Sequence, residues 1–349
     1  MKAAVYLGPG RIDVQEVPTP QCHEGEVLLK IDACAVCGTD LRIYQHGHHA
    51  VTPPHITGHE VSATVAEVGK GVMACQVGDR VTVVTEIGCG QCDWCRRGRQ
   101  NMCPDVSQNL SAIGYRYPGA FAEYMVMPAE GVRQGNILKV SSELPAEQVC
   151  LVEPLSCVIN GQSYLKIVPG ETVLVIGSGP IGCMHVAMAK VQGAAKVILA
   201  DISQSRLRLA EGVSPEVTVN SAEEDLVQRV MDETKGKGAD VVIVACSVPA
   251  AQEQALKLVG IQGRISFFGG LPKDKAVIGF DSNVVHYKEV SVFGAFASYS
   301  YQYLQALALL ESGKVQASRF ITHRFPLSDI VQGFETAIRG DALKVVILP

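Results

Sequence analysis

The sequence has few aromatic residues and no strong excess of charge of either sign. Aromatic residues make up 6% of its 349 residues, tryptophan occurs once, and the formal net charge is -5. So weak an acidic balance provides no electrostatic attraction to nucleic acid or to an anionic membrane surface. Internal repeats and low-complexity tracts are also missing. We therefore expect an ordinary globular protein without nucleic-acid or membrane partners.

Long hydrophobic runs are missing as well. A membrane-spanning helix needs about 18 consecutive apolar residues, and the sequence contains no such stretch. The N-terminus, Met1 to Tyr6, lacks the apolar core of a signal peptide, so we expect a cytoplasmic protein. Twelve cysteines are many for such a protein, and in a reducing compartment they favour metal binding over disulfides.

The length suits two domains, and the pattern of short apolar runs changes near residue 156. Before that point the runs are extended and separated by Gly and Pro, as in 27–31, 61–68 and 80–84, which is typical of a β-rich, barrel-like domain. After it, strands and helices alternate, and this alternation predicts a doubly wound parallel sheet. The expected strands span residues 173–177, 197–201, 217–220, 241–245, 263–268 and 290–294.

The C-terminal tail, from about residue 296, departs from this alternation. Its pattern predicts helices over 301–312 and 327–339 and a closing strand over 344–348. We expect that strand to return to the N-terminal domain. The first domain would then be discontinuous, with residues 1–155 and 297–349 on either side of a second domain of residues 156–296.

A Gly-x-Gly-x-x-Gly motif stands between an apolar run and a helix-compatible run, at Gly177-Ser178-Gly179-Pro180-Ile181-Gly182. Gly177 permits a tight turn, Gly179 lets the backbone approach a pyrophosphate, and Gly182 lets the helix pack closely on the strand. Backbone N–H groups at the helix start would then face the phosphates. A purely structural glycine turn is the alternative, but the flanking elements favour dinucleotide binding.

An acid supports this interpretation. Asp201 ends the next apolar run, about 20 residues after Gly182. A carboxylate at that place accepts hydrogen bonds from the ribose hydroxyls of the adenosine. It would also repel a 2′-phosphate, so we expect NAD rather than NADP as the cofactor.

Four cysteines share one short loop, in the pattern Cys89-x-x-Cys92-x-x-Cys95 followed by Cys103. Four thiolates so placed match a closed tetrahedral zinc site, which has no open position for chemistry. An iron–sulfur site and four unconnected thiols are alternatives, and nearby arginines would suit a zinc ribbon that binds nucleic acid. Because free cysteines prefer apolar cores and these lie among charged residues, structural zinc is the favoured interpretation.

A second set of possible ligands is dispersed over Cys37-Gly38-Thr39-Asp40, Gly58-His59-Glu60 and Glu153-Pro154. A thiolate, an imidazole and a carboxylate with one open position form the composition of a catalytic zinc site. Taken singly, however, a cysteine is usually a core residue and a His-Glu pair is usually a surface contact. Spacing alone therefore does not decide whether these residues form a catalytic zinc site.

In their order along the chain, these motifs resemble those of the zinc-containing medium-chain dehydrogenase/reductases, the alcohol dehydrogenase family, over essentially the full length. The chain looks most like the sorbitol (polyol) dehydrogenase branch, because Glu153 stands where alcohol dehydrogenases carry a cysteine ligand. The resemblance implies a GroES-like catalytic domain and a Rossmann domain. It further implies two zinc ions per chain, one catalytic and one structural, with NAD as cofactor and a dimer or tetramer as the assembly.

The same resemblance assigns roles to residues. Cys37 and His59 are implied as ligands of the catalytic zinc, together with Glu60 or Glu153, and the resemblance leaves open which acid binds directly and which acts through a water. Thr39 is implied to hydrogen-bond to the substrate hydroxyl. Beyond the glycine motif with Pro180 and Ile181, and Asp201, the implied cofactor contacts are Arg206, Phe268, Gly269, Gly270, Ala295, Phe296 and Ala297.

One departure from the family concerns the proton. Many relatives carry a proton-passing histidine five residues after the first ligand, where this chain has Arg42, and an arginine cannot accept a proton. A route through Thr39, a water and Glu153 or the ribose hydroxyls is one replacement. The histidines at 46, 48 and 49 are another, unless they belong to a solvated loop. Arg42 could bind a substrate phosphate, the cofactor pyrophosphate or an acid.

A second departure concerns the substrate. Sorbitol dehydrogenases place an arginine and a tyrosine after a Gly-x-Phe, but here Gly294-Ala295-Phe296 is followed by Ala297-Ser298. The expected function is reversible oxidation of a secondary alcohol of a polyol or sugar alcohol, free or phosphorylated, to a ketone with NAD. An L-threonine 3-dehydrogenase or a butanediol dehydrogenase is the alternative within the family. A zinc-free quinone reductase and a non-catalytic NAD-binding protein are alternatives of other classes.

Overall fold

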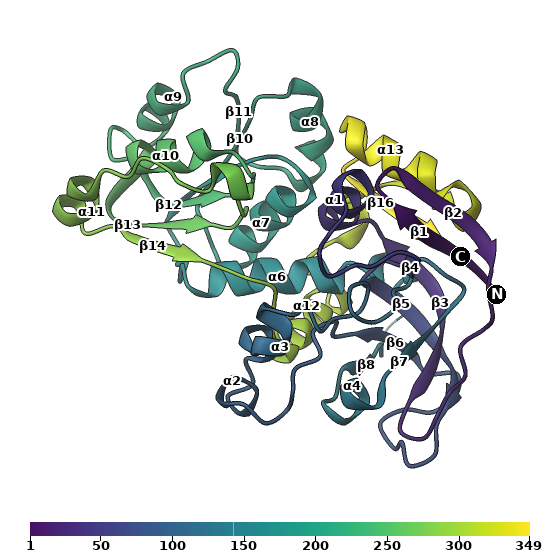
Figure 1. Ribbon diagram of the computed structural model, residues 1–349. Helices are drawn as coiled ribbons and strands as arrows, with labels where there is room; N and C mark the ends of the chain where they lie inside the picture. The colour runs from purple at the N-terminus through teal and green to yellow at the C-terminus, as the bar shows by residue number, and fades with distance from the viewer. Residues whose placement is uncertain (142) are drawn as a thin grey trace. The chain divides into compact units, whose positions relative to one another are not determined.

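The chain folds into two compact units (Figure 1). A computed structural model describes residues 1–141 and 143–349. The first unit consists of Met1–Ser156 and Ala297–Pro349, and the second of Cys157–Phe296. The expected division lies one residue earlier, at 155, and the observed boundary falls inside helix α6 (Val152–Ser163). The fold is mixed α/β, as the sequence predicts.

The first unit is built on two sheets. A three-stranded sheet has the order β2-β1-β4, and a seven-stranded sheet has the order β15-β16-β3-β5-β6-β8, with β7 paired to β3. In sequence order the strands are β1 (Lys2–Gly8), β2 (Arg11–Glu16), β3 (Val27–Ala35), β4 (His55–Ile56), β5 (Glu60–Val68), β6 (Arg80–Val83), β7 (Tyr124–Met127), β8 (Ile137–Lys139), β15 (Ile321–Pro326) and β16 (Lys344–Leu348).

The end of the chain belongs to this sheet. β16 pairs in parallel with β15 and antiparallel with β3, where Val346 lies opposite Ala35. In Figure 1 the yellow C-terminal elements accordingly lie beside the purple N-terminal strands. The closing strand therefore returns to the N-terminal domain at the predicted residues. One buried apolar cluster joins the two segments, with Leu29 from β3 and Phe334 from α13 among its members.

Helices of the first unit are short in its N-terminal segment and longer in its C-terminal one. They are α1 (Gly38–His46), α2 (Asp93–Arg96), α3 (Pro104–Ser107), α4 (Ala129–Arg133), α5 (Ala146–Val149), α12 (Ser300–Glu311) and α13 (Ile330–Arg339). The helix expected over 327–339 is divided, because a 3-10 turn at Leu327–Asp329 precedes α13.

The second unit contains a six-stranded sheet of order β11-β10-β9-β12-β13-β14, in which every pairing is parallel. The strands are β9 (Thr172–Ile176), β10 (Lys196–Asp201), β11 (Val217–Asn220), β12 (Ala239–Val244), β13 (Val259–Phe267) and β14 (Ser291–Gly294). Apolar runs such as Val173–Ile176 are buried because helices cover a parallel sheet on both faces. This is the doubly wound architecture that the alternation predicts.

The order of strand addition reverses between β9 and β12, and ligands of such sheets bind at the carboxyl ends near that point. The helices of this unit are α7 (Pro180–Val191), α8 (Gln204–Leu209), α9 (Leu226–Glu233), α10 (Pro249–Leu258) and α11 (Ser282–Lys288). α7 begins directly after the glycine motif, with Gly179 as its N-cap residue and Pro180 in its first turn.

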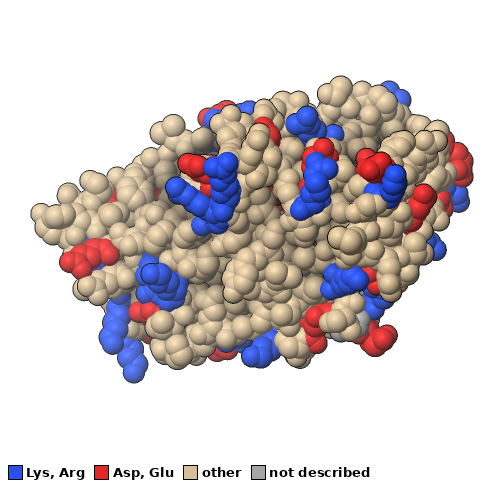
Figure 2. Space-filling model, turned by 90° about the horizontal axis from the view of Figure 1, so that it is seen from below, with Lys and Arg blue, Asp and Glu red and all other residues tan. Residues whose placement is uncertain are grey.

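The surface agrees with the weak net charge. On the face shown in Figure 2, Lys and Arg are interspersed with Asp and Glu over a largely uncharged surface. Within residues 1–141 and 143–349, no helix is both long and apolar enough to cross a membrane.

Candidate metal and cofactor sites

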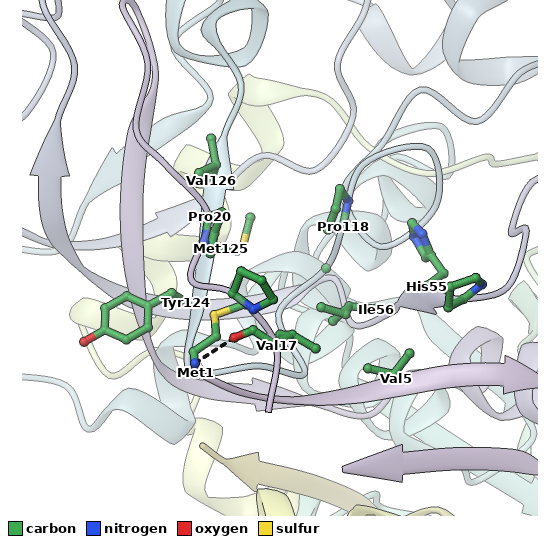
Figure 3. A pocket seen from close by; sticks show the side chains of 13 residues that line it. Met1, Val5, Val17, Pro20, His55, Ile56, Pro118, Tyr124, Met125 and Val126 are labelled. Atoms are coloured by element: carbon green, nitrogen blue, oxygen red, sulfur yellow. Dashed lines mark hydrogen bonds between the residues drawn. The ribbon is translucent and has the colours of Figure 1, made fainter. Parts of the chain in front are cut away.

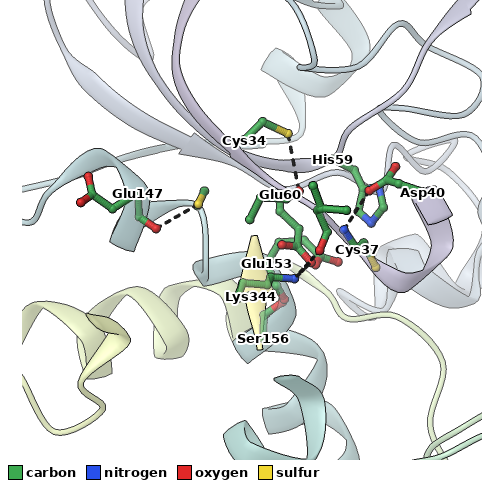
Figure 4. Close-up of polar contacts among 12 residues, drawn as sticks. Cys34, Cys37, Asp40, His59, Glu60, Glu147, Glu153, Ser156 and Lys344 are labelled. Carbon is green, nitrogen blue, oxygen red and sulfur yellow. Dashed lines mark hydrogen bonds and ion pairs between the residues drawn. The ribbon is translucent and has the colours of Figure 1, made fainter. Parts of the chain in front are cut away.

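Three of the expected ligands of a catalytic metal lie together in the first unit. Cys37 is the N-cap residue of α1, His59 directly precedes β5, and Glu60 begins that strand. One ligand atom from each lies within 4.8 Å of the ligand atoms of the other two, and Figure 4 shows the three side chains side by side. The pairing of Glu60 with Ala35 at the end of β3 brings them together, because Cys37 follows two residues later.

Asp40 places a buried carboxylate beside the imidazole of His59. Its Oδ2 accepts a hydrogen bond from the backbone N–H of Cys37 at 3.0 Å, and its Oδ1 lies 3.6 Å from His59 Nδ1. Burial lowers the pKa of His59. The charges of Asp40, Tyr115 and Cys37 raise it by more, so that the pKa lies well above its ordinary value. A carboxylate beside Nδ1 retains a proton there and leaves Nε2 available to a metal ion.

Lys344 compensates the charge of Glu60. The two side chains are 3% and 0% exposed, and Lys344 Nζ lies 2.6 Å from Glu60 Oε1. Nζ also donates to the carbonyl oxygen of Val36 at 3.0 Å. Glu60 Oε2, unlike Oε1, is buried without a hydrogen-bond partner, as are Asp40 Oδ1 and His59 Nδ1 nearby. An unpartnered carboxylate oxygen grouped with a thiol and an imidazole fits a cation, so these residues fit the implied zinc ion.

Glu153, the other candidate acid, is close to this group without belonging to it. It stands in the first turn of α6 and is 7% exposed. Burial is the main cause that raises its pKa to about 8, and the carboxylates of Glu60 and Glu86 add to the rise. His59 and Lys344 act in the opposite direction. A carboxyl group with a pKa near neutrality is suited to proton transfer.

The hydroxyl of Thr39 accepts a hydrogen bond from a cation, and an aromatic ring covers the nearby imidazole of His59. Arg42, one helical turn further along α1, donates from Nη2 to Thr39 Oγ1 at 3.0 Å. The ring of Tyr115 is tilted over that of His59 with the centroids 5.6 Å apart. Burial is the main cause that raises the pKa of Tyr115 well above its ordinary value, so the phenol stays protonated.

Of the three loop histidines, His48 contacts Tyr115 and His49 contacts His48, whereas His46 is exposed. The rings of His48 and Tyr115 meet edge to face at 6.0 Å, and His49 lies 4.4 Å from His48 between centroids. Nδ1 of His48 accepts a hydrogen bond from the backbone N–H of Ala50 at 3.2 Å. That bond occupies the lone pair of Nδ1 and leaves the proton of the neutral ring on Nε2. His46 is exposed at the end of α1.

The four cysteines of the loop also form one group. The sulfur atoms of Cys89, Cys92, Cys95 and Cys103 lie within 4.8 Å of one another. The backbone N–H groups of Gln91 and Cys92 lower the pKa of Cys89 to about 7, whereas burial raises that of Cys95 to about 12. Cys103 Sγ accepts a hydrogen bond from the Cys89 N–H at 3.3 Å. Four converging thiols with N–H donors to sulfur fit a tetrahedral zinc ion.

The glycine motif has the geometry that a dinucleotide requires. Gly177 follows β9 with a φ of 106°, a conformation that favours glycine. A Cβ on Gly182 would overlap the carbonyl oxygen of Gly177, so the helix packs closely on the strand. A Cβ on Gly179 would meet nothing within 4 Å, which leaves open space at the start of α7 for a phosphate.

Asp201 lies at the carboxyl end of β10, beside that motif. Its Oδ2 accepts hydrogen bonds from the N–H and the hydroxyl of Ser178 at 2.7 and 2.9 Å, and its Oδ1 accepts one from the Ser203 N–H at 2.9 Å. Gly177, Asp201 and Arg206 line a cavity of about 970 Å³ in the second unit. The residues present therefore fit the adenosine end of a dinucleotide, with a fixed carboxylate where the ribose would lie.

The remaining expected cofactor residues are spread over both units. In the second unit, Phe268 packs edge to face against His185 at 4.6 Å, Gly269 and Gly270 follow it, and the carbonyl of Phe296 accepts a hydrogen bond from Asn160. Ala297, which follows Ala295 and Phe296, belongs to the first unit and has a φ of 49°.

A separate cavity of about 360 Å³ lies near the N-terminus of the first unit (Figure 3). Apolar side chains form most of its wall, among them Met1, Val17 and Ile56. His55 is the imidazole of this wall, and burial lowers its pKa. The cavity contains none of the residues that the sequence indicates for chemistry.

Several residues of the metal site are not indicated by the sequence. Asp40 belongs to the Cys37 motif but has no obvious role until its carboxylate is seen beside His59. Lys344 is a lysine at the start of a terminal apolar strand, and this placement is the only available indication that it is buried. Tyr115 and the fully buried Glu86, which accepts a hydrogen bond from Tyr303 at 3.0 Å, lie in segments without a recognisable motif.

Two family models match the chain. The alcohol dehydrogenase GroES-like domain matches residues 23–137, and the zinc-binding dehydrogenase domain matches residues 180–312. Between them they cover the expected zinc ligands Cys37 and His59 and the glycine motif from Pro180 onwards.

Similar proteins span essentially the whole chain. L-threonine 3-dehydrogenase of Pyrococcus horikoshii is 38% identical over 100% of this chain and 98% of the relative. Sorbitol dehydrogenase of Bacillus subtilis is 33% identical over 100% of this chain and 97% of the relative. The solved structure of a zinc-binding dehydrogenase from Sinorhizobium meliloti 1021, bound to NADP, matches with a TM-score of 0.91 at 30% identity and covers 100% of this chain and 99% of that one.

Proposed function

This chain belongs to the zinc-containing alcohol dehydrogenase family, and we propose that it reversibly oxidises a secondary alcohol to a ketone with NAD. The grouping of Cys37, His59 and Glu60 carries this proposal. A thiol, an imidazole and a carboxylate leave one of four tetrahedral positions open, which is the composition of a catalytic rather than a structural zinc site.

The proposed roles follow from the contacts of each residue. Cys37, His59 and Glu60 would hold the catalytic zinc, and the loop cysteines would hold the structural one. Asp40 keeps His59 in the tautomer that binds metal. Thr39 would hydrogen-bond to the substrate oxygen. Glu153, with its pKa raised to about 8, is the side chain placed to exchange a proton through a water.

Magnitudes indicate which residues matter most. Bound zinc supplies Lewis acidity worth on the order of 12 kcal/mol, judged by its effect on the pKa of water. A positioned proton acceptor contributes about 10²–10⁴-fold, or roughly 3–5 kcal/mol. The ligands therefore outweigh the proton relay, and a chain with Arg42 in place of a relay histidine can retain turnover.

We propose NAD as the cofactor because of Asp201. Its carboxylate is held by three hydrogen bonds at the carboxyl end of β10 and would repel a 2′-phosphate. Arg206 lines the same cavity, and its positive charge would attract a 2′-phosphate. Its side chain is exposed, however, whereas the carboxylate of Asp201 is held in place. The preference for NAD therefore depends on Asp201.

Two substrate classes are supported. The Glu153 motif favours a polyol or sugar alcohol, free or phosphorylated, whereas the higher identity to an L-threonine 3-dehydrogenase than to a sorbitol dehydrogenase favours L-threonine. Both classes carry a secondary alcohol beside a carbon with a polar substituent, as does 2,3-butanediol. We infer that the site accepts such an alcohol, with L-threonine and polyols as the first candidates.

A rate screen tests this proposal. The zinc-loaded protein is assayed with NAD and with NADP against L-threonine, sorbitol, galactitol 1-phosphate and 2,3-butanediol, by the absorbance of the reduced cofactor. We expect NAD-dependent oxidation of at least one of them, and His59→Ala serves as the inactive control. Turnover of none, with two zinc ions bound per chain, would contradict the proposed substrate class. A zinc content below one per chain would instead favour a zinc-free quinone reductase.

A further inference from the structure

The carboxylate of Asp201 is held by donors from the glycine motif and from the turn that follows β10. Its Oδ2 accepts both hydrogen bonds that Ser178 can donate, from the backbone N–H at 2.7 Å and from the hydroxyl at 2.9 Å. Its Oδ1 accepts a hydrogen bond from the N–H of Ser203 at 2.9 Å. A carboxylate has about four lone-pair sites. Three are therefore used within the chain, and acceptor capacity remains for a ribose hydroxyl.

Ser178 directs all of its donors at this one carboxylate. Its side chain is fully buried, and within the part of the chain that the structure describes its hydroxyl donates to Asp201 alone. Its carbonyl oxygen accepts a hydrogen bond from Cys183 Sγ in α7 at 3.4 Å, which holds the peptide in place. Because the N–H of Ser178 is directed at Asp201, it is not available to a pyrophosphate. The contacts of this residue thus serve the carboxylate and not the phosphates.

A guanidinium in the same cavity competes for that carboxylate. Arg206 lines the cavity together with Asp201, and a paired guanidinium and carboxylate form one of the stronger side-chain interactions in proteins. Among the described residues, however, Arg206 is not an ion-pair partner of Asp201, whose oxygens are directed at Ser178 and Ser203 instead. An Asp201 side chain able to change its rotamer could pair with Arg206. That pair would remove the negative charge from the place where it distinguishes NAD from NADP.

We propose that the hydroxyl of Ser178 determines the preference for NAD by holding Asp201 at the carboxyl end of β10 and away from Arg206. Ser178 is a positioning residue, because it contacts the carboxylate and acts on the cofactor only through it. The inference rests on the proposed function and deepens it. The preference is shared between an acid that ends a strand and a serine inside the glycine motif.

Cofactor binding in the absence of an alcohol tests the proposal. Dissociation constants of NADH and NADPH are measured on the zinc-loaded protein by the fluorescence of the reduced nicotinamide. We expect Ser178→Ala to raise the constant for NADH about fivefold and to leave that for NADPH within about twofold, because one of three hydrogen bonds to the carboxylate is lost. In the Asp201→Ala background, Ser178→Ala should change the ratio of the two constants by less than about twofold, since the carboxylate through which it acts is missing.

Matched variants separate this role from damage to the glycine turn. NAD and NADP share the pyrophosphate, so a distorted turn weakens both alike and leaves their ratio unchanged. An unchanged ratio in Ser178→Ala would therefore overturn the proposal. Ser178→Cys fills the same space with a weaker donor and should lower the preference as Ser178→Ala does; a Cys variant with the original ratio would assign the effect to packing and overturn the proposal. Ser205→Ala removes an exposed hydroxyl that is hydrogen-bonded to Ser203 Oγ at 2.9 Å and should retain the ratio.

The remaining outcomes distinguish this inference from the proposed function. A fall in the ratio that is equally large in the Asp201→Ala background would overturn the inference, as would an equal fall in Ser205→Ala. An unaltered protein that binds NADPH as tightly as NADH, or that binds neither, would overturn it as well. If no alcohol of the screen is oxidised, the proposed function fails, whereas the binding constants still decide the role of Ser178.

Discussion

Lys344 Nζ and Glu60 Oε1 lie 2.6 Å apart although 284 residues separate them in the sequence. Both side chains are buried. β16, which begins with Lys344, and β5, which begins with Glu60, both pair with β3 near Ala35. The last strand of the chain therefore supplies the positive charge that stabilises a candidate metal ligand.

Removal of Lys344 should destabilise the protein strongly. In Lys344→Met the buried carboxylate of Glu60 loses its partner, and a broken buried ion pair costs about 3–5 kcal/mol. We expect a loss of this size in the unfolding free energy of the metal-free protein, measured by denaturant titration. Adding Glu60→Gln should restore part of it. Lys30→Met, on the exposed side of β3, is the control, and an equal loss there would contradict the assigned pair.

Turnover should depend on His59 far more than on Arg42. We expect His59→Ala to abolish activity and to lower the zinc content by about one ion per chain, because three ligands hold a catalytic zinc ion. Arg42→Ala should retain a measurable rate, since it removes a hydrogen bond to Thr39 and no metal ligand. Steady-state rates and metal analysis check both statements. An inactive Arg42→Ala that still binds zinc and NAD would refute this ranking.

The cofactor preference should depend on Asp201. Asp201→Ala removes the carboxylate that would repel a 2′-phosphate, while Arg206 remains in the same cavity. We expect the ratio of kcat/KM for NAD to that for NADP to fall by at least about 10-fold, which corresponds to roughly 1.4 kcal/mol. Asp232→Asn on the exposed side of α9 is the control. An unchanged ratio in Asp201→Ala would exclude this role.

Acid should destabilise the second unit through His185. Burial lowers the pKa of this fully buried imidazole from 6.5 to about 3, and its Nε2 lacks a hydrogen-bond partner. Between pH 6.5 and about pH 3, therefore, His185 binds a proton in the unfolded chain but not in the folded one. The contribution of neutral His185 is complete above pH 6.5 and is lost as the pH falls toward 3.

The size of this effect can be measured. Between neutral pH and about pH 5, His185 should account for about 2 kcal/mol of lost stability, at about 1.4 kcal/mol per pH unit. We expect His185→Leu to lose that much less than the unaltered protein over the same interval, by denaturant titration. Acid release of zinc affects both proteins alike, so the difference isolates His185. Equal losses would show that its pKa is not lowered.

The amino-acid sequence by itself determined the features that depend on residues close together in the chain. The glycine motif lies within six residues, and its turn, its helix start and its flanking strands follow from local dihedral preferences and apolar periodicity. The four loop cysteines lie within Cys89–Cys103, so their spacing alone predicts that they can converge on one ion. The alternation of elements likewise predicted the parallel sheet, and the last apolar run predicted β16 at its observed residues.

Only the tertiary structure decided which distant residues meet. Sequence reasoning left Glu60 and Glu153 equivalent, whereas the register of β3 with β5 groups Glu60 with Cys37 and His59. The pairing of β16 with β3 then brings Lys344 to the same place. Such contacts depend on strand order and register, because a shift of one residue turns a side chain to the opposite face of the sheet. Local sequence does not carry that information.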